Sequence, residues 1–372
     1  MARDRFRVLR LAPPLVAAAC LAGYVALALA QNQGDVGEMA RLGIRRRAGD
    51  PAGLAPYDGQ FSYFLALDSD PATVARHLDV PAYRYQRILY PLLIRLMTLA
   101  NPQLIPWALV IFNIFAQAIG AGLMGVLLAD FGAGRWYALV YGLWVGLVYA
   151  VRLAMPEALA YALVAGALLA SQRGRETWAA VLYGLALFTK ETTILFIGAH
   201  LLWLAARREW PALFRLAALT LLPFGVFQWM LLRWFGRLGL GSGGLLATPF
   251  EIIPYMGLWR IGLISLPALA LFSAILVPLV VLPSLWGLAA SLRRLWRRDW
   301  SLPVLVLAAN AAFIPFTPHS TFREPLGMAR FSVGLVLATL YFGARYASHS
   351  PRALNYSAFW LAGLALLLND PR

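Results

Sequence analysis

The chain has 372 residues, of which 61% are hydrophobic and 13% are charged, whereas soluble globular chains are roughly 45–50% apolar and about 25% charged. The apolar residues form continuous runs near the roughly 20 residues that a helix needs to cross a bilayer, without the alternation of a membrane β-barrel. The net charge of +15 comes from short arginine clusters between these runs, which argues against nucleic-acid binding. A single cysteine, Cys20, excludes an internal disulfide and a cysteine metal site.

The first predicted element is a helix from Leu11 to Ala30, preceded by arginines at positions 3, 5, 7 and 10. Its last residues, Ala28-Leu29-Ala30, resemble a signal-peptidase site. The apolar run is long for a signal peptide, so we interpret it as a retained membrane helix. Both interpretations place Gln31 outside the cytoplasm.

A polar segment follows from Gln31 to Gln86, and its aromatic, amphipathic spacing predicts short helices on the membrane surface. Within it, Asp68-Ser69-Asp70 has the form of a D-x-D metal motif. Because Pro71 comes next, we prefer Asp70 as a helix cap with proline at the first helical position.

The short apolar segment Ile88–Ala100 decides the topology. As a full span it would invert every later loop, whereas as an interfacial or re-entrant helix it inverts none. The positive-inside rule favours the second interpretation, which keeps Arg293, Arg294, Arg297 and Arg298 in the cytoplasm. The predicted spans are then 11–30, 107–129, 136–151, 157–171, 178–190, 192–206, 211–233, 259–289, 301–317, 327–346 and 354–369. We therefore expect an all-α polytopic transmembrane helix bundle of about 11 spans, with one membrane domain over 1–372 and an extracytoplasmic loop over 31–106.

Charged residues at membrane depth need a physical reason. In this topology most of the unexplained charges lie on the extracytoplasmic side. We expect them to converge into a reaction or binding site, although each one alone also fits a polar turn. They are Asp58, Arg152, Glu157, Lys190, Glu191, Glu251, His319, Arg323 and Glu324.

Two residues carry the most specific hypotheses. Lys190 is the only lysine of the chain, and its compact ammonium suits a phosphate, with an ion pair to Glu157 or Glu191 as the alternative. Asp58 lies between aromatic residues, where its carboxylate could act as general base on a sugar hydroxyl. The alternative for Asp58 is an ordinary Asp-Gly turn or a helix cap.

The segment Tyr83-Arg84-Tyr85-Gln86-Arg87 fits two interpretations equally: an interfacial belt, or a contact with a lipid phosphate. His77 and His200 show no metal-ligand spacing. The chain also lacks the G-x-S-x-G, H-E-x-x-H and Walker motifs, which argues against serine hydrolases, zinc proteases and ATPases.

One helix, a large external loop with an early acid, an aromatic-proline segment and a many-helix bundle together resemble the GT-C membrane glycosyltransferases. The nearest likeness is to the mannosyltransferases of GPI-anchor assembly and their bacterial relatives, through Tyr57-Asp58 and Ile88-Leu89-Tyr90-Pro91-Leu92-Leu93. The runs 58–61 and 81–91 resemble more closely an uncharacterised bacterial set associated with cell-surface glycopolymer formation. Ser62 departs from the family pattern, which has an aromatic there, and the loop lacks a second paired acid.

The resemblance implies a polyprenyl-phosphate-linked sugar donor, an acceptor that is a glycan, lipid or protein, and transfer at the outer face of a bacterial plasma membrane. Asp58 matches the acid that activates the acceptor. Charge and topology, without a motif, place other residues at the donor phosphate. These phosphate candidates are Lys190, Arg323, His319, Arg84 and Arg87, with Tyr57, Gln60, Glu157 and Glu191 as supporting residues. No cofactor and no metal ligands are implied, and a role for a divalent metal stays open.

Two other functions remain as alternatives. A lipid-linked-sugar transporter or flippase would also use cations for a phosphate, but it needs access from both faces and ionisable residues deep in several spans. A non-catalytic subunit of a glycopolymer assembly complex would tolerate single replacements of the external charges.

Overall fold

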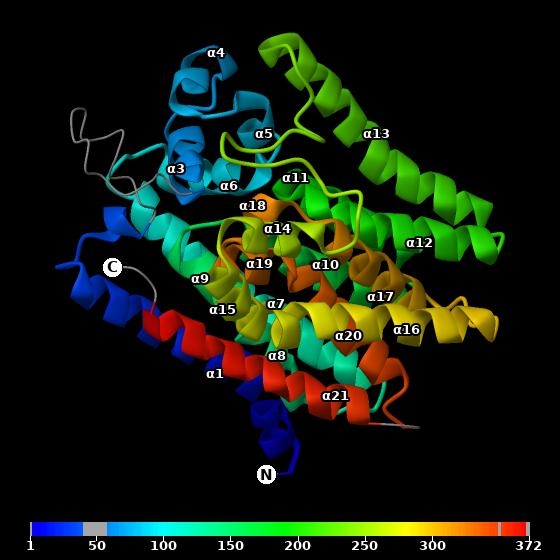
Figure 1. Ribbon diagram of the computed structural model, residues 1–372. Helices are drawn as coiled ribbons and strands as arrows, with labels where there is room; N and C mark the ends of the chain where they lie inside the picture. The colour runs from blue at the N-terminus through cyan, green and yellow to red at the C-terminus, as the bar shows by residue number, and fades with distance from the viewer. Residues whose placement is uncertain (1, 40–57, 349–350, 370–372) are drawn as a thin grey trace.

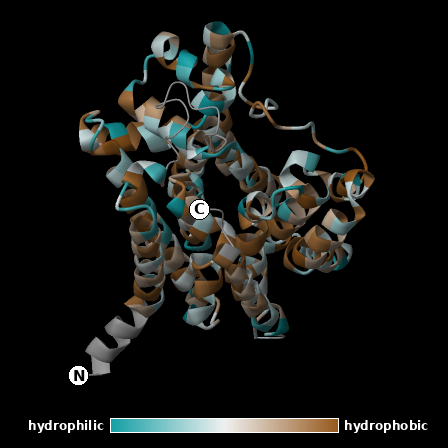
Figure 2. Ribbon diagram, turned by 60° about the vertical axis from the view of Figure 1, so that its left-hand side comes forward, coloured by the Kyte–Doolittle hydropathy of each residue, from teal (hydrophilic) through white to brown (hydrophobic). Residues whose placement is uncertain are grey.

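The computed structural model describes residues 2–39, 58–348 and 351–369, and every regular element within these ranges is a helix. Figure 1 shows long helices forming a bundle, with the short helices α3 to α6 gathered at one end of it. Hydrophobic residues dominate the bundle in Figure 2, while hydrophilic residues gather among the short helices and at helix tips. This distribution is the one expected of a protein whose bundle lies in lipid.

Four helical segments are long and apolar enough to cross a membrane, and a bent pair of helices would make a fifth. The bent pair is α19 with α20, which meet at 47° around Ser332. The prediction of several membrane-crossing helices is therefore supported by length and composition. The four segments are Leu11–Gln31 of α1 (Ala2–Gln31), α7 (Ile105–Asp130), α13 (Trp210–Phe235) and Leu266–Trp296, and the pair is Pro325–Phe331 and Val333–Arg345.

Shorter apolar helices occupy most of the other predicted spans. The segment around 88–100 forms α6 (Leu89–Thr98), whose 10 residues are too short to cross a bilayer. This length agrees with the interfacial or re-entrant interpretation. Other short helices in predicted spans are α10 (Glu157–Gln172), α11 (Glu176–Thr189), α12 (Ile194–Ala206), α17 (Leu302–Phe313) and α21 (Arg352–Ser357). The four-residue α18 (His319–Phe322) lies between two predicted spans. The 3₁₀ segments are Val36–Glu38, Ala75–His77, Arg135–Tyr137, Glu191–Thr193, Ile314–Phe316 and Ala358–Asn369.

The described part of the first external loop contains α3 (Gly59–Leu67), α4 (Pro71–Val74) and α5 (Pro81–Tyr85). The Asp70 side chain accepts a hydrogen bond from the backbone N–H of Thr73, and Pro71 opens α4. The predicted capping role of Asp70 is therefore confirmed. Positions 40–57 of the loop, including Tyr57, lie outside the described residues.

The predicted span 136–151 is broken into α8 (Ala138–Gly142) and α9 (Val145–Arg152), with Trp144 extended between them. The buried Trp144 donates from Nε1 to the Ala329 carbonyl oxygen at 2.8 Å. A Cβ on Gly146 would overlap that same carbonyl. The break thus allows α9 to pack tightly against α19. Local hydropathy could not predict it, because the contact joins residues that are distant in sequence.

The predicted span 259–289 also differs, because a helix ends and another begins at Ser265. There α14 (Met256–Ile264) stops, and the extended Ser265 caps α15 (Leu266–Leu276) through the N–H of Ala268. The chain continues through a π-helical turn, η5 (Val277–Val281), into α16 (Leu282–Trp296). The long apolar segment therefore begins later and ends later than the prediction.

Candidate active site

Eight charged side chains from well-separated segments meet where α3, α5, α10 and α19 approach one another. The largest sequence separation bridged by one hydrogen bond is 272 residues, between Arg330 and Asp58. We call these residues the charge cluster: Asp58, Asp79, Arg84, Arg87, Glu157, Lys190, Glu191 and Arg330. With four acids and four cations, the cluster carries no net formal charge.

Asp58 precedes the first residue of α3, and its side chain makes no capping hydrogen bond. Its Oδ1 lies 2.6 Å from Arg84 Nη1, and its Oδ2 lies 3.0 Å from Arg330 Nη2. Burial would raise the pKa of the Asp58 carboxyl, but the positive charges of Arg84 and Arg330 outweigh burial and hold that pKa well below its ordinary value. The carboxylate is therefore ionised but weakly basic in this arrangement.

Arg84 lies in α5 and is held on several sides. Asp79 accepts from its Nε at 2.7 Å and from its Nη2 at 2.9 Å, a two-pronged pairing that fits the planar guanidinium. The guanidinium carbon also lies 4.2 Å from the centre of the Phe61 ring and 4.9 Å from that of Tyr83. Arg84 is therefore a fixed cation rather than a mobile surface side chain.

Glu157 is the first residue of α10, where a negative charge is favoured by the helix dipole. Its fully buried carboxylate accepts from Lys190 Nζ at 2.8 Å and from Arg330 Nη2 at 2.7 Å, both on Oε1. Its Oε2 accepts no hydrogen bond from the described residues. For Lys190, the structure therefore shows the ion pair with Glu157 that the sequence offered as an alternative.

A second pair extends the cluster from α5 toward the junction of α11 and α12. Glu191 accepts from Arg87 Nε at 2.8 Å and from Nη2 at 2.6 Å. The Tyr83 hydroxyl accepts from the same Nη2, and the guanidinium carbon lies 4.4 Å from the Tyr83 ring centre. Tyr83, Arg84 and Arg87 thus point into the cluster, whereas Tyr85 packs its ring against Phe227 and Phe235. The segment therefore does not form only a belt on the surface.

Other predicted site residues lie elsewhere or touch the cluster less directly. The exposed Arg323 belongs to none of the cluster's ion pairs, and His319 Nδ1 lies 2.9 Å from the Gly257 carbonyl oxygen. Neither was fixed by a motif, and both precede the helix that delivers Arg330. Gln60 is buried in α3, and its Oε1 has no hydrogen-bond partner in the part of the chain described.

A small pocket adjoins the cluster, lined by Asp58, Phe61, Ser62, Leu65, Arg84, Arg87 and Pro156. Its volume of about 20 Å³ is room for a single water-sized group. In this arrangement the pocket therefore has no room for a phosphate group. Among the described residues, no group of three His, Cys, Asp or Glu side chains is placed to hold a metal ion.

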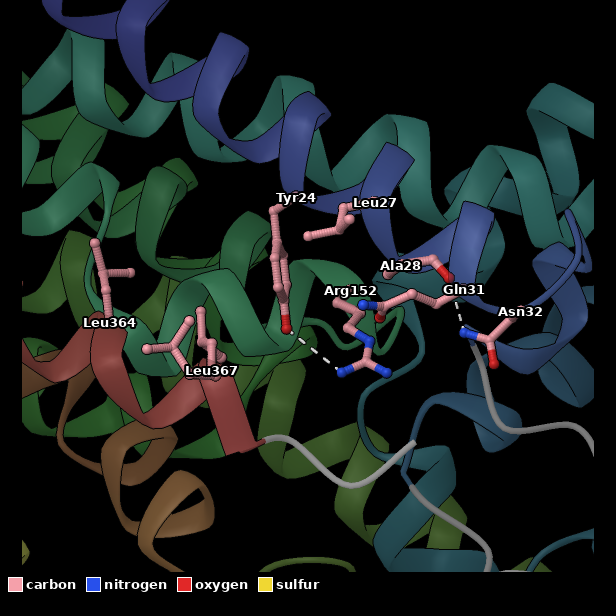
Figure 3. A pocket seen from close by; sticks show the side chains of 9 residues that line it. Tyr24, Leu27, Ala28, Gln31, Asn32, Arg152, Leu364 and Leu367 are labelled. Atoms are coloured by element: carbon pink, nitrogen blue, oxygen red, sulfur yellow. Dashed lines mark hydrogen bonds between the residues drawn. The ribbon is translucent and has the colours of Figure 1, made fainter.

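A larger cavity of about 320 Å³ lies apart from the cluster, between α1, α9 and the C-terminal 3₁₀ segment (Figure 3). Leu27, Leu364 and Leu367 form its apolar walls, and Arg152 donates to the Tyr24 hydroxyl at 3.4 Å. Arg152, predicted to join the external charges, thus faces this cavity. No ion pair in the described structure links it to the charge cluster.

No protein-family model, curated protein or solved structure matches this chain. Arg330 and Asp79 are cluster members that the sequence did not single out. Arg330 had one usable signal, since it is an arginine within a predicted apolar span. Asp79 had no comparable signal, because acids are common in polar loops.

Proposed function

We propose that the chain is a membrane glycosyltransferase of the GT-C kind, which moves a sugar from a polyprenyl-phosphate donor to an extracytoplasmic acceptor in cell-surface glycan assembly. The observation that carries the proposal is the charge cluster, where three buried arginines and the buried sole lysine pair with four acids that are between 0% and 28% exposed. Buried charge is costly, and clusters of buried ionisable groups occur preferentially at functional sites. About eleven membrane crossings, with the shorter helices included, remain part of this proposal.

The cations suit a donor whose leaving group is a phosphate. Arg84, Arg87 and Arg330 present planar, forked donors, which match phosphate oxygens in two-pronged contacts. Their positive charge would stabilise the negative charge that grows on the phosphate as its bond to the sugar breaks. Lys190, buried against Glu157, would add to the local positive potential without direct contact.

Asp58 is the group proposed to activate the acceptor. Its carboxylate would take the proton of the acceptor hydroxyl while the acceptor oxygen forms its bond to the anomeric carbon. The bond between that carbon and the phosphate oxygen breaks, and the electron pair leaves with the phosphate. Attack from the face opposite the leaving group inverts the anomeric centre, so we propose an inverting transferase.

The test uses purified full-length protein and a panel of synthetic polyprenyl-phosphate sugars. We expect turnover with at least one donor, and a slowing of roughly 10²–10⁴-fold in Asp58→Asn, because a general base is lost. Asp130→Asn is the matched control, since Asp130 pairs with Arg173 at the opposite end of α10 from Glu157. Full turnover in Asp58→Asn would refute the base role. Folded protein without turnover on any donor would refute the transferase.

A further inference from the structure

The two arginines that pair with Asp58 would each keep a carboxylate partner if the Asp58 side chain moved away. Each of its two arginines already holds a second carboxylate. Arg84 donates Nε and Nη2 to Asp79, and Arg330 donates Nε and Nη2 to Glu157 at 3.0 and 2.7 Å. Removing one partner of a buried pair is costly when it strands a charge. Here neither arginine would be stranded if Asp58 left.

Asp58 is also the acid that water reaches most easily. Its side chain is 28% exposed, against 15% for Asp79, 14% for Glu191 and 0% for Glu157. Its side chain does not cap α3, so the helix does not need the carboxylate in place. A released Asp58 could therefore be solvated at little cost, unlike the fully buried Glu157.

The Arg330 contact is the weaker of the two that hold Asp58. Its Nη2 lies 3.0 Å from Asp58 Oδ2 but 2.7 Å from Glu157 Oε1, so a single NH₂ group is shared between two acids. The adjoining pocket of about 20 Å³ has no room for a phosphate group while these pairs stand. An incoming phosphate must therefore compete with a carboxylate for the same donors.

We propose that the phosphate of a polyprenyl lipid exchanges with the Asp58 carboxylate on Arg84 and Arg330, and that this exchange frees Asp58 for the acceptor hydroxyl. The catalytic part of this inference rests on the proposed function, whereas the exchange itself is a binding event. Arg330 is thereby a phosphate-binding residue that also holds Asp58 back. Donor binding then precedes activation of the acceptor, and Asp58 without donor stays a poor base.

The test measures binding of a sugar-free polyprenyl monophosphate to purified full-length protein in detergent. Asp58→Asn removes the competitor, so we expect it to bind the lipid about tenfold more tightly than wild type, the effect of one charged hydrogen bond that no longer has to be broken. A second binding series in Arg330→Gln asks whether Arg330 is the contested donor. In the Arg330→Gln background, the gain in lipid affinity caused by Asp58→Asn is expected to fall to about half of its value in wild type, or less.

Arg330→Lys repeats the series with the charge retained and the forked donors lost, and it serves if Arg330→Gln does not fold. The affinity gain caused by Asp58→Asn could stay undiminished in both Arg330 backgrounds. Asp58 would then act only through its long-range electrostatic field, and the proposed exchange would be wrong. Equal or weaker binding by Asp58→Asn, or no binding by any variant, also overturns it. Tighter binding by Asp58→Asn, together with no sugar transfer by the wild-type protein on any donor, would uphold the exchange and refute the proposed transferase.

Discussion

Two sets of ion pairs in this protein differ in burial. In the charge cluster the paired side chains are between 0% and 28% exposed, and several of them share partners. The pairs Arg173–Asp130 and Arg207–Glu209 stand alone, with exposures of 48% and 29% in the first and 56% and 37% in the second. Both groups have comparable distances, from 2.6 to 3.0 Å.

The comparison shows that distance alone says little about what an ion pair does. An exposed pair contributes roughly 0–1 kcal/mol, because water screens the charges and the side chains lose freedom on pairing. A buried pair also contributes little net stability. Removing only one of its partners, however, strongly destabilises the protein, because an unpaired charge stays buried. Single substitutions should therefore separate the charge cluster from the exposed pairs by their effect on stability.

The largest difference between the two groups is expected when one acid is removed from each. Glu157→Gln keeps the shape of the side chain but leaves Arg330 and Lys190 without their shared charge, and we expect a loss of about 3–5 kcal/mol in the free energy of unfolding. Asp130→Asn should lose no more than about 1 kcal/mol. Unfolding of purified protein in detergent, followed by circular dichroism, measures both. Equal losses would mean that burial does not separate the two groups.

A smaller effect is expected where α9 supports the helix that delivers Arg330. Gly146→Ala would place a methyl group against the Ala329 backbone and should destabilise the protein by about 1–3 kcal/mol. Gly198→Ala is the control, because a Cβ there meets no atom within 4 Å and alanine favours the helix. Thermal unfolding measures the difference. A Gly146→Ala protein as stable as wild type would show that the contact between α9 and α19 accommodates a methyl group.

The pH dependence of stability tests the paired state of Asp58 in the charge cluster. Because the pKa of Asp58 is lowered in the folded state, the unfolded chain binds more protons below about pH 5, and stability must fall as pH drops through and below the unfolded value of about 3.9. Asp58→Asn should make this decline shallower than in wild type. Chemical unfolding at several pH values between about 3 and 7 tests this. An unchanged slope in Asp58→Asn would contradict the paired state of the carboxylate.

Local sequence patterns predicted much of the helical framework. The segments 157–171 and 178–190 match α10 and α11 within a few residues, because hydropathy marks the whole length of each helix. Asp70 was predicted as a cap from its neighbour Pro71, a relation confined to adjacent residues. The break at Trp144 escaped prediction, because its cause is a contact with Ala329, distant in sequence.

The sequence by itself determined that the chain is helical, that it contains segments able to cross a membrane, and that unexplained charges gather near the ends of those segments. These properties follow from residue type and spacing, which act over one or two helical turns. Only the tertiary structure decided which acid meets which cation. It joined Asp58 to Arg330 and Lys190 to Glu157, and left Arg323 outside. The reason is physical: a charge selects its partner through the packing of distant helices, which no local pattern encodes.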